Sequence, residues 1–192
     1  METLRILVAD DESIRLLSLR KQLTALGHSV VAEASTGDEA VALAASARPD
    51  LAILDIKMPV VDGIEAAERI TQARPIPIIL LTAYDEAQLV ERAAQANISA
   101  YLMKPVAEED LLPAITLALA RFRQFQALRQ EVADLREALE ARKTIERAKG
   151  ILMRRLNLSE EEAFRRLQKQ SQDSNRRLAQ VAEAIVVADQ FL

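Results

Sequence analysis

Five side chains that can handle a metal ion and a phosphoryl group each stand at the end of a short apolar run. Asp10 and Asp11 follow the first run, Asp55 the second, Thr82 the third, and Lys104 the fourth. Carboxylate oxygens are ligands that Mg²⁺ favours, and a carboxylate can attack phosphorus to form an acyl phosphate. An ammonium group stabilises charge on the phosphoryl oxygens during transfer. These residue types predict a phosphorylation site with Mg²⁺ as its cofactor, provided that the runs end at one place.

The elements that carry these residues alternate along the first 120 positions. Short apolar runs predict strands at 4–9, 29–33, 51–54, 77–82 and 99–103. Amphipathic stretches between them predict helices at about 13–26, 37–47, 62–73 and 86–96, with a fifth from about 107. This pattern predicts an α/β fold, a doubly wound five-stranded parallel sheet of the flavodoxin type. Such sheets bind ligands at the carboxyl ends of their strands, where the acids, Thr82 and Lys104 fall.

The second half of the chain has a different apolar spacing. Pro113 is expected to kink the fifth helix or to divide it. A heptad pattern with steps of three and four residues follows, formed by Phe125, Leu128, Val132, Leu135 and Leu139. This seam predicts a coiled-coil linker over 122–140 that forms a homodimer. The alternative is that the stripe packs on the chain's own terminal helices.

The last part of the sequence predicts a small three-helix module. The long helix continues to about residue 156, and Ser159 to Glu162 form a capping box that opens the next helix. Asp173 or Ser174 is expected to cap the last helix. So small a module buries little apolar surface by itself, which favours dimerisation.

Composition limits the class of protein. The chain has no cysteine, which excludes disulfides and thiolate metal sites. No apolar stretch approaches the roughly 20 residues that span a bilayer, so we expect a soluble, cytoplasmic protein. Residues 1–141 carry a net charge of −8, whereas residues 142–177 carry 11 Lys and Arg against 5 Asp and Glu, a net charge of +6. The basic segment suggests a polyanionic partner, although a solvated helix surface is the alternative.

Residues 1–121 resemble the receiver domain of bacterial two-component response regulators. The matching segments are Val8–Asp11, Asp55–Pro59 with Asp62 and Gly63, Thr82–Ala83, and Tyr101–Pro105. The resemblance implies that Asp55 is the phosphoacceptor and that a histidine kinase is the phosphodonor. A phosphoacceptor of this kind is not an enzyme in the usual sense, because it catalyses only the transfer and hydrolysis of its own phosphoryl group.

The same resemblance implies roles for the residues around Asp55. Mg²⁺ would be held by Asp10, Asp11, Asp55 and the backbone carbonyl of Lys57. Thr82 and Tyr101 would form the switch pair, and Lys104 would pair with the phosphoryl group. The peptide bond between Lys104 and Pro105 is expected to be cis.

Residues 130–191 resemble the ANTAR domain, an RNA-binding module of transcription antitermination regulators. The carrying segments are 145–153, 159–167 and 175–182. The resemblance implies a dimer that binds RNA hairpins and prevents a terminator from forming. The residues that suit phosphate binding are Lys149, Gly150, Arg154, Arg165, Arg166, Lys169, Arg176 and Arg177.

Several alternatives stay open. Gly150 within a helix indicates either close approach of nucleic acid or another backbone, or close helix packing. A DNA-binding output would need a helix-turn-helix around 172–175, and a protein-binding output would use the heptad seam. The function that the sequence predicts is an RNA-binding antiterminator controlled by phosphorylation of Asp55.

Overall fold

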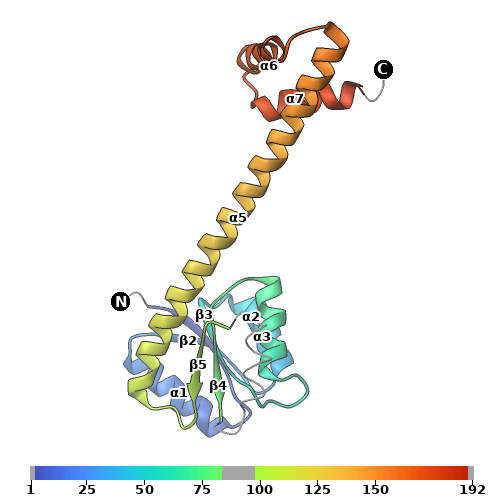
Figure 1. The fold of residues 1–192 in the computed structure, drawn as a ribbon. Helices are drawn as coiled ribbons and strands as arrows, with labels where there is room; N and C mark the ends of the chain where they lie inside the picture. The colour runs from blue at the N-terminus through green and yellow to red at the C-terminus, as the bar shows by residue number, and fades with distance from the viewer. Residues whose placement is uncertain (1–2, 84–97, 190–192) are drawn as a thin grey trace. The chain divides into compact units, whose positions relative to one another are not determined.

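Five short apolar segments form a parallel sheet in the computed structural model, which describes residues 3–83 and 98–189 (Figure 1). The strands are β1 (Arg5–Ala9), β2 (Ser29–Ala34), β3 (Leu51–Asp55), β4 (Ile78–Thr82) and β5 (Ala100–Met103). Their order across the sheet is β2-β1-β3-β4-β5, which confirms the predicted doubly wound sheet. The winding reverses between β1 and β3, so the carboxyl ends of these two strands lie side by side at the point where such sheets bind ligands.

Helices cover both faces of the sheet. One face packs against α1 (Ser13–Ala25) and the start of α5, and the other packs against α2 (Gly37–Ala47) and α3 (Gly63–Ala73). Every residue of β3 and β4 is buried, which explains why both strands appear as unbroken apolar runs in the sequence. The helix predicted at 86–96 lies outside the described residues.

Helix α5 (Glu108–Leu156) is a single helix of 49 residues. We predicted that Pro113 would kink or divide this helix, and the division is wrong, because the helix continues through this residue. Proline at this position removes the hydrogen bond to the carbonyl of Glu109 and costs about 3 kcal/mol. The burial of Leu111 and Ile115 against the sheet offsets that cost. Despite its length, α5 has no apolar stretch able to span a bilayer, nor has any other described helix.

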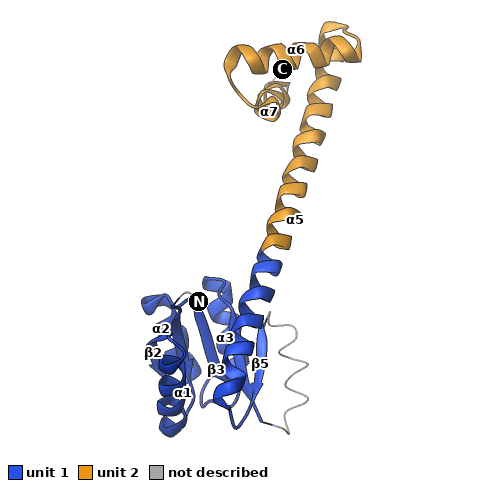
Figure 2. Cartoon of the chain, turned by 90° about the vertical axis from the view of Figure 1, so that its left-hand side faces the viewer, with its two compact units in different colours: residues 1–126 blue, residues 127–192 orange. Residues whose placement is uncertain are grey.

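The chain divides into two compact units, residues 1–126 and residues 127–192, and α5 contributes to both (Figure 2). In the second unit the end of α5 packs with α6 (Glu160–Ser174) and α7 (Leu178–Asp189). The core of this unit is small, and its buried members are Ala148, Leu167, Val181 and Ala182. The predicted three-helix module is confirmed.

The helix ends of the second unit agree with the sequence in one case and differ in another. Ser159 and Glu162 form the predicted capping box at the start of α6. Asp173 and Ser174 do not cap α7, because both lie within α6, which ends at Asn175 in the left-handed conformation. At the start of α7 the backbone N–H of Arg177 donates to Gln180 Oε1 at 3.2 Å. A side chain within α7 therefore satisfies this donor.

His28, the single histidine, is buried beside the first strand. The backbone N–H of Leu4 donates to its Nδ1 at 3.4 Å, and its Nε2 has no partner among the described residues. Burial lowers the pKa of His28 below its ordinary value of 6.5. The folded chain therefore holds the neutral imidazole, which stabilises the fold fully only above that pH.

We predict that the free energy of unfolding decreases as the pH falls below 6.5, because the unfolded chain binds the proton more tightly. The loss due to one such group is at most about 1.4 kcal/mol per pH unit. Urea titrations between pH 7.5 and 5.5 measure it, with His28→Asn as the non-titrating control. Equal slopes for the two proteins would contradict the assignment.

Candidate functional site

The carboxyl ends of β1 and β3 bring the predicted acids together. Ala9 pairs with Leu54 in the sheet, so Asp10 and Asp55, each one residue further, stand next to each other. Oxygen atoms of Asp10, Asp11 and Asp55 all lie within 4.8 Å of one another. Asp10 and Asp55 are buried, whereas Asp11 is exposed. The cluster is therefore enclosed on the sheet side and accessible from solvent on the side of Asp11.

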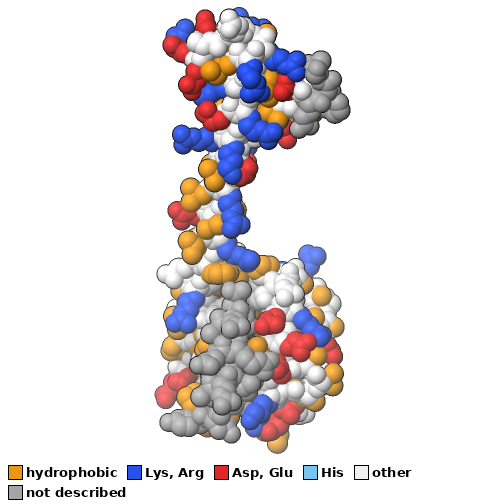
Figure 3. Space-filling view, turned by 45° about the vertical axis from the view of Figure 1, so that its right-hand side comes forward, with side chains coloured by type: hydrophobic (Ala, Val, Ile, Leu, Met, Phe, Trp, Pro, Cys, Tyr) orange, Lys and Arg blue, Asp and Glu red, His pale blue; other side chains and the backbone are white. Residues whose placement is uncertain are grey.

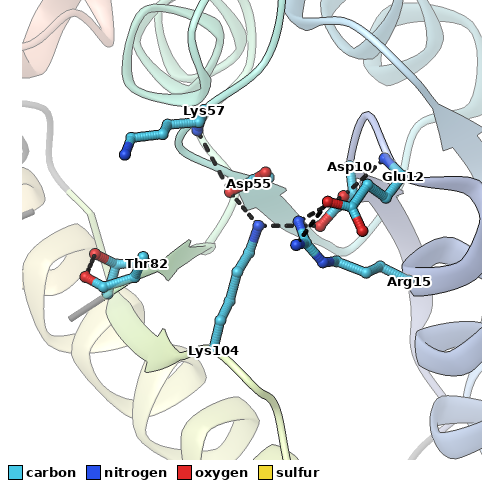
Figure 4. Close-up of polar contacts among 8 residues, drawn as sticks. Asp10, Glu12, Arg15, Asp55, Lys57, Thr82 and Lys104 are labelled. Carbon is cyan, nitrogen blue, oxygen red and sulfur yellow. Dashed lines mark hydrogen bonds and ion pairs between the residues drawn. The ribbon is translucent and has the colours of Figure 1, made fainter. Parts of the chain in front are cut away.

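Lys104 reaches this cluster from the end of β5 (Figure 4). Its Nζ lies 2.6 Å from Asp55 Oδ1 and 3.2 Å from Asp10 Oδ2. The peptide bond between Lys104 and Pro105 is cis, as expected. The four residues Asp10, Asp11, Asp55 and Lys104 thus form one site, although they come from three separate strand ends.

Two residues that sequence reasoning missed complete the surroundings of Asp10. The backbone N–H of Glu12 donates to Asp10 Oδ1 at 2.9 Å. The Arg15 guanidinium lies 3.5 Å from the same oxygen and 2.7 Å from Glu12 Oε1. Glu12 and Arg15 could have been found in the sequence because they stand at the start of the helix that follows β1, within one turn of Asp11. Arg15 adds positive charge beside a fully buried carboxylate.

Burial raises the pKa of Asp55 above its ordinary value of 3.8, the Lys104 ammonium lowers it, and the Asp10 carboxylate raises it. The carboxylates of Asp10, Asp11 and Asp55 carry more negative charge than Lys104 and Arg15 offset, because Arg15 also pairs with Glu12. A divalent cation with oxygen ligands suits this imbalance, and exposed Asp11 leaves room for water molecules in its coordination shell. The residues therefore fit Mg²⁺, as the sequence predicted.

The loop after β3 holds the acceptor strand in place. A Cβ atom on Gly63 would lie 2.0 Å from the backbone carbonyl oxygen of Asp55, so only glycine permits this close approach. The Asp62 side chain caps α3 by accepting a hydrogen bond from the backbone N–H of Glu65 at 2.8 Å. This contact confirms the predicted start of a helix at residues 62 and 63. Close packing of the start of α3 against the end of β3 fixes the position of Asp55.

Lys57 contributes its backbone to the site. Its N–H donates to Asp55 Oδ1 at 3.3 Å, and its side chain points away from that carboxylate (Figure 4). The role of the Lys57 carbonyl as a metal ligand stays a prediction.

Thr82 and Tyr101, the predicted switch pair, lie on neighbouring strands. Thr82 pairs with Met103 and Leu80 pairs with Tyr101, so the two side chains are diagonal neighbours on one face of the sheet. Thr82 is buried and its hydroxyl donates to the Ala83 carbonyl at 3.2 Å. Burial raises the pKa of Tyr101, and Arg121 on α5 acts in the opposite direction. Tyr101 is half-buried and packs on the face of the sheet that α2 and α3 cover, and its switching role stays a prediction.

In the second unit, Lys149 is engaged within the chain. Its Nζ lies 2.7 Å from Glu160 Oε1 and 2.9 Å from Glu146 Oε1, and 5.9 Å from the centre of the Phe164 ring. Hydrogen bonds with Glu160 and then Glu146 raise the pKa of Lys149. Lys149 thus ties α5 to the first turn of α6, and its predicted contact with RNA would have to compete with two carboxylates.

The other predicted RNA-binding side chains are exposed on three segments. Arg154 lies on α5, Arg165, Arg166 and Lys169 lie on α6, and Arg176 and Arg177 lie in the turn before α7. Arg166 and Arg176 line a cavity of about 330 Å³ whose apolar wall includes Leu167, Val181 and Ile185. Arg165 instead pairs with Glu161. The structure therefore brings Arg166 and Arg176 to one cavity, which their positions in the sequence did not reveal.

The heptad seam is exposed on α5. Phe125, Leu128, Val132, Leu135 and Leu139 are 39%, 58%, 41%, 64% and 54% exposed. Figure 3 shows hydrophobic side chains along one side of this helix and Lys and Arg side chains along another. The alternative that the seam packs on the chain's own terminal helices is therefore not what the described part of the structure shows.

We predict that Lys104→Met raises the pKa of Asp55 further in metal-free protein, because it removes the cation that favours the carboxylate. The pH dependence of the Asp55 carboxyl ¹³C chemical shift measures this change. Lys57→Met is the matched control and should leave that pKa unchanged, because its side chain points away. An unchanged or lower pKa in Lys104→Met would refute the electrostatic role of Lys104.

Two families of known proteins match the chain. The response regulator receiver domain matches residues 6–116, and the ANTAR domain matches residues 133–186. The transcriptional regulatory protein PdtaR of Mycobacterium tuberculosis is 46% identical over 182 residues, which cover 95% of this chain and 89% of that protein.

Solved structures support the same assignment for the first unit. The receiver domain of a modulated diguanylate cyclase from Desulfovibrio desulfuricans is 33% identical with a TM-score of 0.60, and the match covers 64% of this chain and 98% of that one. A CheX–CheY complex with BeF3 and Mg²⁺ from Borrelia burgdorferi is 25% identical with a TM-score of 0.55. This match covers 58% of this chain and 85% of the other chain. The chain belongs to the two-component response regulators, with a receiver domain followed by an ANTAR output domain.

Proposed function

We propose that this protein is an RNA-binding transcription antiterminator controlled by phosphorylation of Asp55. The observation that carries the proposal is a complete acidic site with its lysine in one unit, joined through one continuous helix to an ANTAR unit. The site has the groups for phosphoryl transfer, and residues 142–177 of the second unit carry a net charge of +6, which suits RNA.

In the proposed transfer, an Asp55 carboxylate oxygen attacks the phosphorus of a phosphohistidine on a histidine kinase. A P–O bond forms, the P–N bond breaks, and the imidazole leaves with the electron pair. Asp10, Asp11, Asp55 and the Lys57 carbonyl would hold Mg²⁺, which neutralises charge on the phosphoryl oxygens when bound. The similar CheX–CheY structure contains Mg²⁺ and BeF3, which supports this choice of metal.

Lys104 and Thr82 act on the phosphoryl group after it arrives. Lys104 already lies 2.6 Å from the acceptor oxygen, so a small movement lets its ammonium pair with the phosphoryl oxygens. The Thr82 hydroxyl turns from the Ala83 carbonyl to donate to the same group. Water then attacks the phosphorus of the acyl phosphate, the bond between phosphorus and the Asp55 oxygen breaks, inorganic phosphate leaves, and Asp55 returns to the carboxylate.

The signal leaves the site through Tyr101 and α5. Movement of Thr82 opens space for its diagonal neighbour Tyr101, whose hydroxyl is influenced by Arg121 on α5. The start of α5 is packed firmly on the sheet through Leu111, Ile115 and Ala118. A shift of this packing is transmitted along the helix to the seam, where it changes dimerisation.

The charges beside the seam favour a parallel dimer. With Phe125, Val132 and Leu139 at the first heptad position, Arg129, Arg136 and Lys143 take the fifth position and Glu131 takes the seventh. In a parallel pair, Glu131 faces Arg136 of the partner chain twice. In an antiparallel pair, the three basic residues face one another and repel. The seam ends where its next positions become Arg142 and Glu146.

An RNA-binding output is favoured over a DNA-binding one. In a helix-turn-helix, α7 would be the helix that reads the major groove. This helix carries no Lys or Arg, and its exposed positions include Ala184, Val187 and Ala188. The ANTAR match over residues 133–186 also supports RNA. Unpaired bases can stack on Arg guanidinium groups, which suits a unit with several exposed arginines and little aromatic surface.

We expect the chain to bind a hairpin RNA more tightly than a duplex DNA of equal charge, and to bind it more tightly after treatment with acetyl phosphate and Mg²⁺. Fluorescence anisotropy at several salt concentrations measures both affinities. The log of the association constant should fall with the log of salt, since phosphate binding releases counterions.

Asp55→Asn is the control for phosphorylation. It should incorporate no acid-labile phosphate and should show no response to the phosphodonor, with its basal RNA affinity retained. Equal affinity for RNA and DNA would overturn the RNA assignment, and a response retained in Asp55→Asn would overturn the assigned acceptor.

We predict that Leu128→Cys forms a disulfide-linked dimer on mild oxidation, because parallel seams bring the two copies of this residue together. The natural chain has no cysteine, so non-reducing gels report this bond alone. Gln130→Cys, on the outer side of the same helix, is the matched control and should stay monomeric on the gel. Cross-linking only between mixed Leu128→Cys and Leu139→Cys chains would show an antiparallel dimer instead, because such a dimer pairs fourth with first heptad positions.

A further inference from the structure

Gly150 lies within the regular helix α5, yet nothing in the described structure requires a glycine there. A Cβ atom at this position would approach one side-chain atom among the described residues, Arg154 Nη1, at an ordinary contact distance of 3.8 Å. No left-handed backbone is present at this residue. Close helix packing within the chain therefore does not account for Gly150.

Glycine at this place also weakens the helix. Within a helix, glycine is less favourable than alanine, because the unfolded chain gains freedom and no side chain shields the backbone. An alanine would fit the described structure and remove that cost. The remaining physical use of the glycine is to let another molecule approach the backbone of α5 closely.

The face of α5 around Gly150 is basic. Lys143, Arg147 and Arg154 stand at intervals that place them on the same side of the helix as Gly150. All three side chains are exposed. The acidic neighbour one turn before the glycine, Glu146, is paired with Lys149. Lys143 pairs with Glu140 at 2.7 Å, so the two guanidinium groups of Arg147 and Arg154 are the charges that flank the half-exposed backbone of Gly150.

This face points away from the core of its own unit. Ile145, Ala148 and Leu152 pack towards α6 and α7. Gly150 stands two residues from both Ala148 and Leu152, and two residues turn an α-helix by about 200°. The exposed side chains of Arg147 and Arg154 are therefore available to a partner while the three helices stay packed.

We infer that the phosphodiester backbone of RNA crosses α5 at Gly150, between Arg147 and Arg154. This inference rests on the proposed RNA-binding function and identifies the contact face. The glycine lets the strand lie against the helix backbone, and the guanidinium groups of Arg147 and Arg154 pair with successive phosphates. Lys149 is a positioning residue here, since it binds Glu146 and ties α5 to α6.

The charge on this face argues against a second copy of the chain as the occupant. A symmetric contact would place Lys143, Arg147 and Arg154 near their own copies, and like charges at short distance repel. The apolar seam ends at Leu139, so no hydrophobic contact continues to Gly150 to offset that repulsion. A polyanion gains from the charges of Arg147 and Arg154.

The experiment compares hairpin RNA binding by the natural chain, Gly150→Ala and Gly150→Leu. We expect Gly150→Ala to raise the melting temperature by about 2–4 °C and to weaken RNA binding by about tenfold. Gly150→Leu should weaken binding further, because its side chain holds the strand farther away. Ala133→Leu, at an exposed position on the outer side of α5, is the size control and should bind normally.

The charged residues are tested by salt dependence. Arg147→Gln and Arg154→Gln should each reduce the slope of log affinity against log salt by about one. Arg123→Gln, on the first unit's part of α5, is the matched control and should leave the slope unchanged.

The outcomes separate this inference from the proposed function. If the natural chain binds no hairpin RNA, the proposed function fails. If it binds RNA and Gly150→Ala binds equally well, only the contact at Gly150 is refuted. If Gly150→Ala changes the dimer dissociation constant in sedimentation while RNA affinity per dimer is unchanged, the face contacts a second copy, and the RNA assignment of this face is wrong.

Discussion

The ion pairs of Lys104 with Asp55 and Asp10 are the interaction on which the receiver site depends. Two carboxylates buried next to each other repel, and burial penalises their charge. Lys104 lowers that cost from a third strand, and in doing so it connects β5 to β1 and β3 across the edge of the sheet. A phosphoryl group that enters this place competes for the same ammonium. The arrangement that stabilises the resting site is therefore the one that phosphorylation would change.

Helix α5 is the element that connects the receiver site to the second unit. Its start is held by the sheet and its end by α6 and α7, while every residue from 127 to 140 is exposed. A helix stretch with no tertiary contacts depends on its own propensity and on what partners supply. The exposed seam therefore makes this stretch the part of the chain most sensitive to association. Control through dimerisation would need such a stretch, one that is exposed and carries an apolar seam.

The structure confirmed the predictions that depend on a residue's type and on its immediate neighbours in the sequence. The strands were predictable because both faces of the sheet are covered and the runs are wholly apolar. The capping box of Ser159 and Glu162 was predictable because its spacing is fixed. The expected division at Pro113 was wrong, since burial of neighbouring side chains outweighs a local preference. Asp173 and Ser174 were expected to cap α7, but α6 extends through both.

The sequence by itself determined the chemistry of the first site and the two families to which the halves belong. The acids, Thr82 and Lys104 are chemically specific, and each follows an element whose direction the apolar pattern sets. Only the tertiary structure decided which charges are already paired. Lys149 and Arg154 are alike as basic residues in one helix, yet Lys149 meets Glu160 from α6, whereas Arg154 lies exposed beside Gly150. Such pairing depends on contacts between helices, which spacing along a single helix does not encode.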